Sequence, residues 1–264
     1  MTSKAVKIAS QNQLEKIEAF RELHVPGKPL VLYNIWDAGS ALAVAKSGAK
    51  AIATSSWAVA KAHGFSDGEQ IPYDVAIQNL LRIVAAVDLP VTFDLESGYG
   101  DDPAKVAKSI SLAMNAGAVG CNLEDSVPAT GAIRDLTAQA ARIRGARDAA
   151  EIAGTPFFIN ARCDLFFQGD SVPHDEKLLG KVIERAHAYA EAGADGLFVP
   201  GLTTIAFISE LTKKSPVPVN ILAVSGTPLQ ALADSGVSRV SYGATPYLEV
   251  LKGLEQAAKA SLAA

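Results

Sequence analysis

The stretch AGADGLFVPG, residues 192–201, is the part of the sequence from which the fold can be worked out. Its first glycine separates the end of an amphipathic segment from a short apolar run. Three other stretches have the same form: SGAKAI at 47–52, AGAVGC at 116–121 and SGVSRV at 235–240. A glycine in this place is typical of a helix that ends on a left-handed residue. The weak repeat therefore predicts four helix-to-strand junctions of one kind.

Prolines mark four further junctions, at Pro29, Pro90, Pro156 and Pro218. Proline forces the residue before it into an extended conformation, so a preceding helix stops there. The predicted strands are 30–36, 51–56, 90–95, 119–124, 156–161, 195–199, 217–222 and 238–242. Because these runs are almost continuously apolar, we expect a parallel sheet that helices cover on the outside.

Amphipathic segments alternate with these strands. Residues 177–192 place apolar side chains at three- and four-residue steps, and residues 103–116 begin with a capping aspartate and a proline. A further helix is expected near 12–24. Eight strand–helix units predict one α/β domain over residues 1–264, a (β/α)8 TIM barrel with an extra N-terminal helix.

An open doubly wound sheet is the structural alternative to the barrel. Such a sheet would more often carry a glycine-rich dinucleotide turn after its first strand. The turn in this chain reads NIWDAGSA, residues 34–41, and has no such motif. The barrel is therefore favoured.

The composition is typical of a globular enzyme-sized chain, with 264 residues, 49% apolar and 20% charged. No run of about 18 apolar residues is present, so we expect no membrane span. The first twenty residues do not resemble a signal peptide, which predicts a cytoplasmic protein. A net charge of −4 without a basic stripe argues against a nucleic-acid partner. Cys121 and Cys163 lack metal-type spacing and are expected to be free thiols.

Polar side chains gather where the predicted strands end, and the active sites of such barrels lie at the carboxyl ends of the strands. The candidates are Asp94, Glu96, Asn122, Glu124, Asp125, Asn160, Arg162, Asp164 and Asn220. Alternate residues of a strand face the same side. We therefore expect Asp94 with Glu96, and Glu124 with Arg162, to converge on the barrel axis.

Three carboxylates this close repel one another unless a cation lies between them. Mg²⁺ prefers oxygen ligands, retains several waters and is often held by one or two carboxylates. Asp94, Glu96 and Glu124 therefore predict a magnesium site, with Mn²⁺ as the alternative ion. The glycines of SGYG, residues 97–100, would let the backbone turn tightly beside it. Helix caps or surface loops are expected instead for Asp101, Asp102 and Asp125.

Four motifs resemble those of the isocitrate lyase / phosphoenolpyruvate mutase superfamily. They are DLESGYG at 94–100, NLEDS at 122–126, NARCD at 160–164 and TSSWAVAKAHGFSDG at 54–68. The resemblance runs from about Pro29 to Tyr247. It implies a (β/α)8 barrel that uses Mg²⁺ and cleaves a small 2-oxo or polycarboxylic acid through an enolate or aci-carboxylate. It also implies a homo-oligomer, a dimer or tetramer, in which neighbours often exchange the last helix, although the segment 245–264 is short.

The resemblance assigns roles around the metal by position. It implies that Asp94 is the direct metal ligand, and that Glu96, Glu124 and Asp67 hold metal-bound waters once the loop of Asp67 closes. Glu96 stands where aspartate is more frequent and reaches one methylene further. We expect a contact through water to tolerate that difference.

The resemblance also assigns the substrate contacts. Backbone N–H groups around Ser55, Ser56 and Trp57 would bind the substrate carboxylate, and the Trp57 ring would pack on the carbon skeleton. Arg162 would neutralise charge on the enolate oxygen or on a carboxylate through its rigid donor fork. Asn220 would add a hydrogen bond. Arg162, Glu124 and Asp67 are therefore the predicted catalytic residues.

One departure from the superfamily pattern bears on the reaction. Lyase members carry K-[KR]-C-G in the loop after the fourth strand, whereas this loop reads SVPATGAIRDL, residues 126–136, with Arg134 as its only basic residue. An oxaloacetate-decarboxylase-like or atypical isocitrate- or methylisocitrate-lyase-like activity fits this loop best. The alternatives are P–C chemistry, as a phosphonopyruvate hydrolase or mutase, and a 2-oxo-acid-binding barrel with little turnover.

Overall fold

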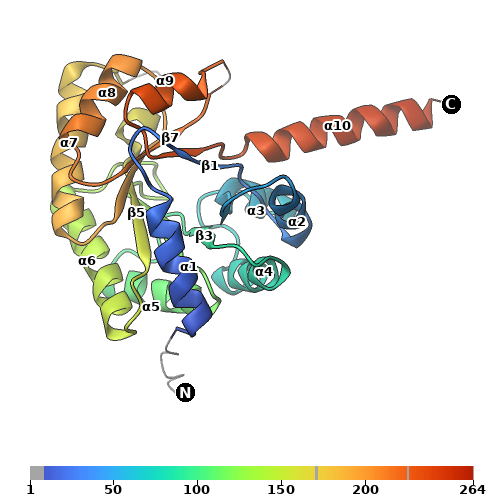
Figure 1. Cartoon of the computed structure of the whole chain (residues 1–264), viewed down its shortest axis with the longest axis horizontal. Helices are drawn as coiled ribbons and strands as arrows, with labels where there is room; N and C mark the ends of the chain where they lie inside the picture. Colours follow the sequence, from blue (N-terminus) through green and yellow to red (C-terminus); the bar gives the residue numbers. More distant parts are fainter. Residues whose placement is uncertain (1–8, 170–171, 225, 264) are drawn as a thin grey trace.

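Eight parallel strands form a nearly closed barrel in the computed structural model, which describes residues 9–169, 172–224 and 226–263 (Figure 1). The strands are β1 Leu30–Leu32, β2 Ile52–Ala53, β3 Val91–Asp94, β4 Gly120–Glu124, β5 Phe158–Arg162, β6 Gly196–Val199, β7 Val219–Leu222 and β8 Arg239–Ser241. They pair in the order β1-β8-β7-β6-β5-β4-β3-β2. A single parallel bridge between Ile35 and Thr54 joins the two ends of this order. The predicted barrel is thus confirmed.

Helices alternate with the strands and surround them (Figure 1). They are α1 Gln11–Glu22, α2 Ala38–Lys46, α3 Ser56–Ala62, α4 Tyr73–Ala86, α5 Pro103–Asn115, α6 Leu136–Ile152, the 3₁₀ turn η1 Asp164–Phe167, α7 Glu176–Glu191, α8 Ile205–Lys214, α9 Leu229–Asp234 and α10 Thr245–Leu262. The extra N-terminal helix is confirmed as α1. The sequence did not predict α3 or η1, which both lie on the carboxyl side of the barrel.

The junctions between helices and strands have the predicted chemistry. The glycines before β2, β4, β6 and β8 all adopt left-handed backbones, with φ of 90° at Gly48, 94° at Gly117, 103° at Gly193 and 83° at Gly236. Asp102 caps α5 by accepting a hydrogen bond from the backbone N–H of Lys105, directly before Pro103.

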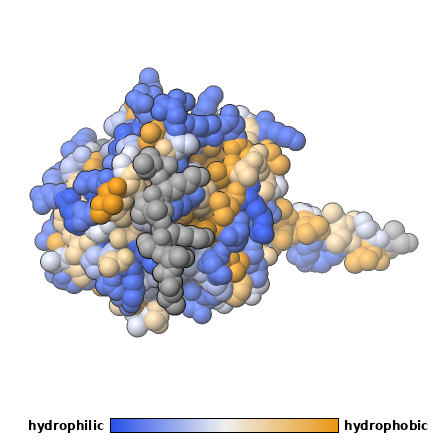
Figure 2. Space-filling model, turned by 90° about the horizontal axis from the view of Figure 1, so that it is seen from below, coloured by the Kyte–Doolittle hydropathy of each residue, from blue (hydrophilic) through white to orange (hydrophobic). Residues whose placement is uncertain are grey.

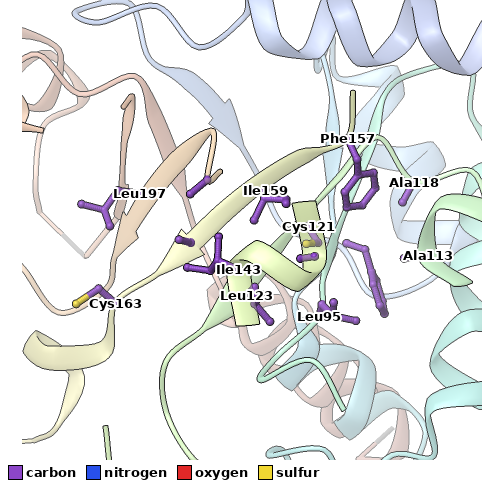
Figure 3. Close-up of a cluster of buried hydrophobic side chains, with 14 of the residues drawn as sticks. Leu95, Ala113, Ala118, Cys121, Leu123, Ile143, Phe157, Ile159, Cys163 and Leu197 are labelled. Atoms are coloured by element: carbon purple, nitrogen blue, oxygen red, sulfur yellow. The ribbon is translucent and has the colours of Figure 1, made fainter. Parts of the chain in front are cut away.

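Two apolar clusters support the barrel. The larger lies between the strands and the surrounding helices, and Figure 3 shows its part around β4, β5 and α6 with Cys121, Leu123, Ile143 and Ile159. Cys121 and Cys163 are buried free thiols, as expected. In the smaller cluster Ile17 and Phe20 of α1 contact the starts of β1 and β5, through Leu30 and Phe158. Helix α1 therefore covers the amino end of the barrel and leaves the carboxyl end for the site.

The last helix, α10, extends away from the barrel (Figure 1). Of its side chains only Pro246 is buried. Figure 2 shows apolar surface along this helix and on the adjoining body of the protein. None of the described helices has the length and apolar character needed to cross a bilayer.

Candidate active site

Asp94 ends β3 at the carboxyl end of the barrel, where the start of α3 and the neighbouring strand β4 fix its carboxylate. Oδ2 accepts a hydrogen bond of 2.9 Å from the backbone N–H of Ser56, at the start of α3. Oδ1 accepts one of 3.3 Å from the side chain of Asn122 on β4. The backbone N–H of Asp94 donates to Thr54 Oγ1 at 2.8 Å. The carboxylate is thereby held by donors on two sides, in a defined orientation.

Arg162 ends β5 between two carboxylates. Its Nη1 lies 2.9 Å from Glu124 Oε2 and its Nε lies 2.6 Å from Asp164 Oδ1. The guanidinium also lies over the rings of Phe167 and Phe198, at 5.4 and 5.8 Å. Burial raises the pKa of Glu124, an effect that the charge of Arg162 opposes. The structure therefore brings Glu124 and Arg162 together, and it adds Asp164, which the sequence did not single out as a catalytic residue.

Asp125 corrects one expectation, because it is neither a cap nor a surface residue. Its side chain is completely buried. Oδ1 accepts from the backbone N–H of Asp164 at 2.8 Å, and Oδ2 contacts Arg185 at 3.1 Å and the Tyr189 hydroxyl at 2.8 Å. A buried carboxylate without partners is costly, so this network is needed to keep it ionised. It anchors η1, and with it Asp164 beside Arg162.

Glu96 does not continue the strand alternation that links it to Asp94. Strand β3 ends at Asp94, and Glu96 has a left-handed backbone with φ of 53°. Its Oε2 accepts from the backbone N–H of Glu69, and its Oε1 accepts from the Tyr99 hydroxyl. Burial raises the pKa of Glu96 to about 7.

Asp67 lies in the turn that contains Glu69 and is exposed to solvent. Partial burial raises its pKa, and the charge of Asp94 raises it further, while Arg162 acts in the opposite direction. Asp67 is thus close enough to the other site residues to interact with their charges. Repulsion between Asp67 and Asp94 is the kind of interaction that a bound cation relieves.

Ser55, Ser56 and Trp57 form the start of α3, with Ser55 as its N-cap. The backbone N–H of Ser55 donates to Ile35 O at 3.0 Å as part of the barrel closure, and that of Ser56 donates to Asp94. Two of the three predicted carboxylate donors thus already have partners within the protein. The N–H of Trp57, in the first turn, has no preceding helical carbonyl to bond. Of the three backbone N–H groups, that of Trp57 is therefore the one left to bind a substrate.

Asn220 lies on β7 inside the barrel, beside Arg239 of β8. Ser241 donates to its Oδ1 at 3.2 Å, while its Nδ2 is buried without a protein partner among the described residues. Arg239 is 1% exposed and donates to Asn122 Oδ1 at 3.2 Å. Arg239, at the start of β8, was not among the residues predicted to lie near the site, although a charged residue inside an apolar strand is an unusual signal.

The oxygen-only donor set suits Mg²⁺. Among residues 9–169, 172–224 and 226–263, no three His, Cys, Asp or Glu side chains gather into a ready-made metal cluster. Direct ligation by three or more such side chains is therefore absent from the described arrangement. One direct carboxylate with waters completing the shell, which is a common mode for Mg²⁺, remains compatible with Asp94 and its neighbours.

The loop after β4 is a short hairpin held in place by hydrogen bonds and an ion pair. Ser126 pairs with Ile133, and the Ser126 hydroxyl donates to Glu124 Oε1 at 2.7 Å. Arg134 contacts Ser97 Oγ at 3.0 Å and Asp101 at 2.9 Å. The basic group of this loop is therefore engaged at the rim of the site.

Comparison with known proteins matches residues 20–262 to the model of the phosphoenolpyruvate phosphomutase family. The 2-methylisocitrate lyase of Escherichia coli K12 is 30% identical over 253 residues, covering 92% of this chain and 81% of the enzyme. A crystal structure from Burkholderia cenocepacia J2315, provisionally described as a phosphonomutase, is 54% identical with a TM-score of 0.92, covering 94% of this chain and 99% of that one.

A structure of phosphonopyruvate hydrolase in complex with oxalate and Mg²⁺ has the same fold. It is 21% identical, with a TM-score of 0.78, and the match covers 92% of this chain and 86% of the hydrolase. The family model covers nearly the whole barrel, and the carboxylates and Arg162 lie at its carboxyl end. The chain belongs to the phosphoenolpyruvate phosphomutase family, a family of enzymes within the isocitrate lyase / phosphoenolpyruvate mutase superfamily.

Proposed function

We propose that the protein is a Mg²⁺-dependent carbon–carbon lyase or decarboxylase of the cytoplasm, acting as one domain over residues 1–264. Its substrate is a small 2-oxo or hydroxy polycarboxylate, and oxaloacetate is the first compound to test. The observation that carries the proposal is the placement of Arg162, which Glu124 and Asp164 hold at the same barrel end as Asp94. This arrangement supplies a positive group where an enolate oxygen develops charge.

Asp94 would hold the Mg²⁺ or Mn²⁺ ion directly, with Glu124 and Asp67 acting through waters. When bound, the ion would supply Lewis-acid chemistry to the substrate. Neither ion pair of Arg162 uses Nη2, so this nitrogen is the one left for a substrate oxygen. Trp57 would bind the substrate carboxylate with its backbone N–H and pack its ring on the carbon skeleton. The side-chain Nδ2 of Asn220, which has no partner among the described residues, would add a hydrogen bond.

In decarboxylation, the electron pair of the breaking C–C bond moves onto the 2-oxo oxygen as CO₂ leaves. Arg162 stabilises the enolate that forms. The loop 126–136 offers no thiol, imidazole or ammonium group to protonate its carbon. Water therefore supplies that proton, which gives pyruvate from oxaloacetate.

The direct test measures pyruvate release from oxaloacetate in the presence of Mg²⁺. We expect the wild-type protein to exceed the background of free Mg²⁺, and Asp94→Ala to fall to that background. Equal rates for the wild type, Asp94→Ala and the metal alone would overturn the decarboxylase proposal. Binding of oxalate by calorimetry without turnover would instead favour the barrel that binds 2-oxo acids.

Chemistry at a P–C bond is the second candidate, and the 54% identical structure provisionally described as a phosphonomutase favours it. The loop after β4 opposes it, since it offers only Ser126, Thr130 and Arg134 as polar groups beside Asp135. Release of inorganic phosphate from phosphonopyruvate tests this candidate. Phosphate release without any reaction on oxaloacetate would replace the first proposal with the second.

We further propose a homo-oligomer, a dimer or tetramer, in which α10 of one copy packs on another. The eighth strand–helix unit does not cover its own strands, because α10 points away from the barrel (Figure 1). Val31 and Tyr33 at β1 are each 38% exposed as a result. A groove of about 1030 Å³, lined by Leu23, Val31 and Val44 among others, lies at this place.

A further inference from the structure

Both carboxylate oxygens of Glu96 are engaged by the protein. Oε2 accepts a hydrogen bond of 2.5 Å from the backbone N–H of Glu69, and Oε1 accepts one of 3.2 Å from the Tyr99 hydroxyl. The Glu96 side chain reaches a loop 27 residues away in sequence and is only 4% exposed. These contacts leave little of the carboxylate for a metal-bound water.

Glu69 returns the contact to the loop of Glu96. Its Oε1 accepts from the backbone N–H of Tyr99 at 2.7 Å. Glu69, Glu96 and Tyr99 are thus joined in pairs, and each loop both donates to and accepts from the other. One loop follows β2 and the other follows β3, so these contacts join two neighbouring loops at the mouth of the barrel.

The same three residues have strained backbones. In the part of the chain that the structure describes, Glu69, Glu96 and Tyr99 are the non-glycine residues with positive φ, at 60°, 53° and 53°. L-residues rarely adopt this conformation, and it persists only where surrounding contacts impose it. All such residues here lie in one cluster, beside the proposed catalytic groups.

Residues of α6 and α4 hold the loop 96–100, which forms one side of the cluster. Arg142 donates to the backbone carbonyl oxygens of Ser97 and Gly100, the latter at 3.0 Å. The ring of Tyr73 lies 4.5 Å from that of Tyr99. The loop 96–100 is therefore the fixed partner, and the turn 67–69 is the part that depends on the contacts.

We propose that Glu69, Glu96 and Tyr99 form a clasp that positions Asp67 at the active site. Asp67 lies two residues before Glu69 in the same turn, and its carboxyl group interacts with the charges of Asp94 and Arg162. Glu96 thus acts as a positioning residue through Glu69, rather than through a metal-bound water. The inference rests on the proposed function for the role of Asp67, but the clasp itself does not.

Glu96→Asp separates the two roles. Aspartate is one methylene shorter and cannot reach the Glu69 N–H from the braced loop. A clasp predicts that amide hydrogen exchange at Glu69 becomes at least tenfold faster and that kcat/KM for oxaloacetate falls at least tenfold, while Mg²⁺ affinity by calorimetry changes less than threefold. A water-mediated metal role predicts that Glu96→Asp keeps wild-type exchange and activity.

A pair of variants at position 69 tests the other half of the clasp. Glu69→Gln keeps an oxygen of the same reach for the Tyr99 N–H, so exchange at Tyr99 and activity should stay within threefold of wild type. Glu69→Asn tolerates a left-handed backbone but is too short to reach Tyr99. It should raise exchange at Tyr99 at least tenfold. Glu184→Asp, at an exposed position on α7, is the control for an acidic shortening elsewhere.

Unchanged exchange at Glu69 in Glu96→Asp, or equal exchange at Tyr99 in both position-69 variants, would overturn the clasp. Wild-type exchange and wild-type activity in Glu96→Asp would return Glu96 to the metal site. Hydrogen exchange and calorimetry require no turnover. If the wild type is inactive on oxaloacetate, the proposed function is wrong, and the exchange measurements still decide whether the clasp exists.

Discussion

Arg162 shows at the scale of one residue how charge and geometry combine. Two carboxylates fix its planar guanidinium by ion pairs at 2.9 and 2.6 Å, and two aromatic rings flank it. A lysine could keep the charge but could not make both contacts from one rigid group. The arrangement therefore depends on the shape of the side chain as well as on its sign.

Arg162→Lys should lower kcat for the proposed reaction by about 10²-fold, the effect of losing one well-placed donor to a developing oxyanion. The KM should change much less, because the metal and Trp57 would still bind the ground state. Steady-state kinetics of pyruvate release check this, with exposed Arg82→Lys on α4 as control. Wild-type kcat in Arg162→Lys would remove Arg162 from the mechanism.

His24 gives a pH prediction away from the active site. Burial first, and then the charge of Arg239, lower its pKa from 6.5 to about 3, while its Nδ1–H donates to Phe20 O. The folded protein therefore holds His24 neutral where the unfolded chain would bind a proton. Its contribution to stability is complete above pH 6.5 and decreases by roughly 1.4 kcal/mol per unit as the pH falls from 6.5 towards 3.

The measurement is urea unfolding at pH 7, 6 and 5 for the wild type and His24→Gln. Because glutamine does not titrate, the difference between the two free energies of unfolding isolates His24 from the carboxylates. The wild type should lose stability relative to the variant at each step below 6.5. A difference that does not vary with pH would contradict the neutral, buried state of His24.

At the scale of elements, the glycines that end the helices are the features that sequence predicted best. Gly48 and Gly117 hold equivalent places before β2 and β4 and have φ of 90° and 94°. Their surroundings differ. A β-carbon at Gly48 would meet nothing within 4 Å, whereas one at Gly117 would lie 2.8 Å from Cγ1 of Val84.

Gly48→Ala should therefore cost about 1 kcal/mol, the strain of a left-handed alanine. Gly117→Ala should cost roughly 2 to 4 kcal/mol, because the stiff Val84 side chain must also move. Chemical denaturation of both variants measures the difference, and each serves as the other's control. Equal losses would mean that packing against α4 does not contribute at this junction.

Regular features of the barrel were thus predictable, since repeated glycines and prolines mark each junction locally. The ends of the strands were not. The predicted strand 30–36 is regular only at Leu30–Leu32, because the chain then departs to close the ring through Ile35. Glu96 was misplaced for a related reason: strand alternation holds only while the backbone stays extended, and its φ of 53° ends it.

The residues of the candidate site were also predictable only in part. Strand ends identified Asp94, Glu124 and Arg162, because the carboxyl ends of parallel strands meet at one edge. Partners from distant segments were hidden, since nothing local reveals that Tyr189 and Arg185 of α7 bury Asp125. Glu69 was missed because its importance arises only where two loops meet.

At the scale of the whole molecule, α10 is the element whose sequence conflicts with its surroundings. Leu248, Leu251 and Leu254 follow one another at three-residue spacing, and Leu254 is 63% exposed. Burial of such side chains is favourable by roughly 25 cal/mol for each Å² removed from water. A second copy offers the uncovered groove beside β1 as the complementary surface.

Leu254→Glu should therefore shift the assembly to smaller species, because a charge cannot be buried in an apolar groove without a partner. The isolated chain should tolerate it, since the position is exposed there. Light scattering coupled to size exclusion should give a dimer or tetramer for the wild type and a lower mass for the variant. The apparent melting temperature of the variant should also fall, because the variant lacks the stability gained by association.

Gln256→Glu is the control, because it adds the same charge about 200° around the helix from Leu254 and should leave the mass unchanged. A monomeric wild type, or equal masses for all three proteins, would mean that α10 does not dock on a second copy.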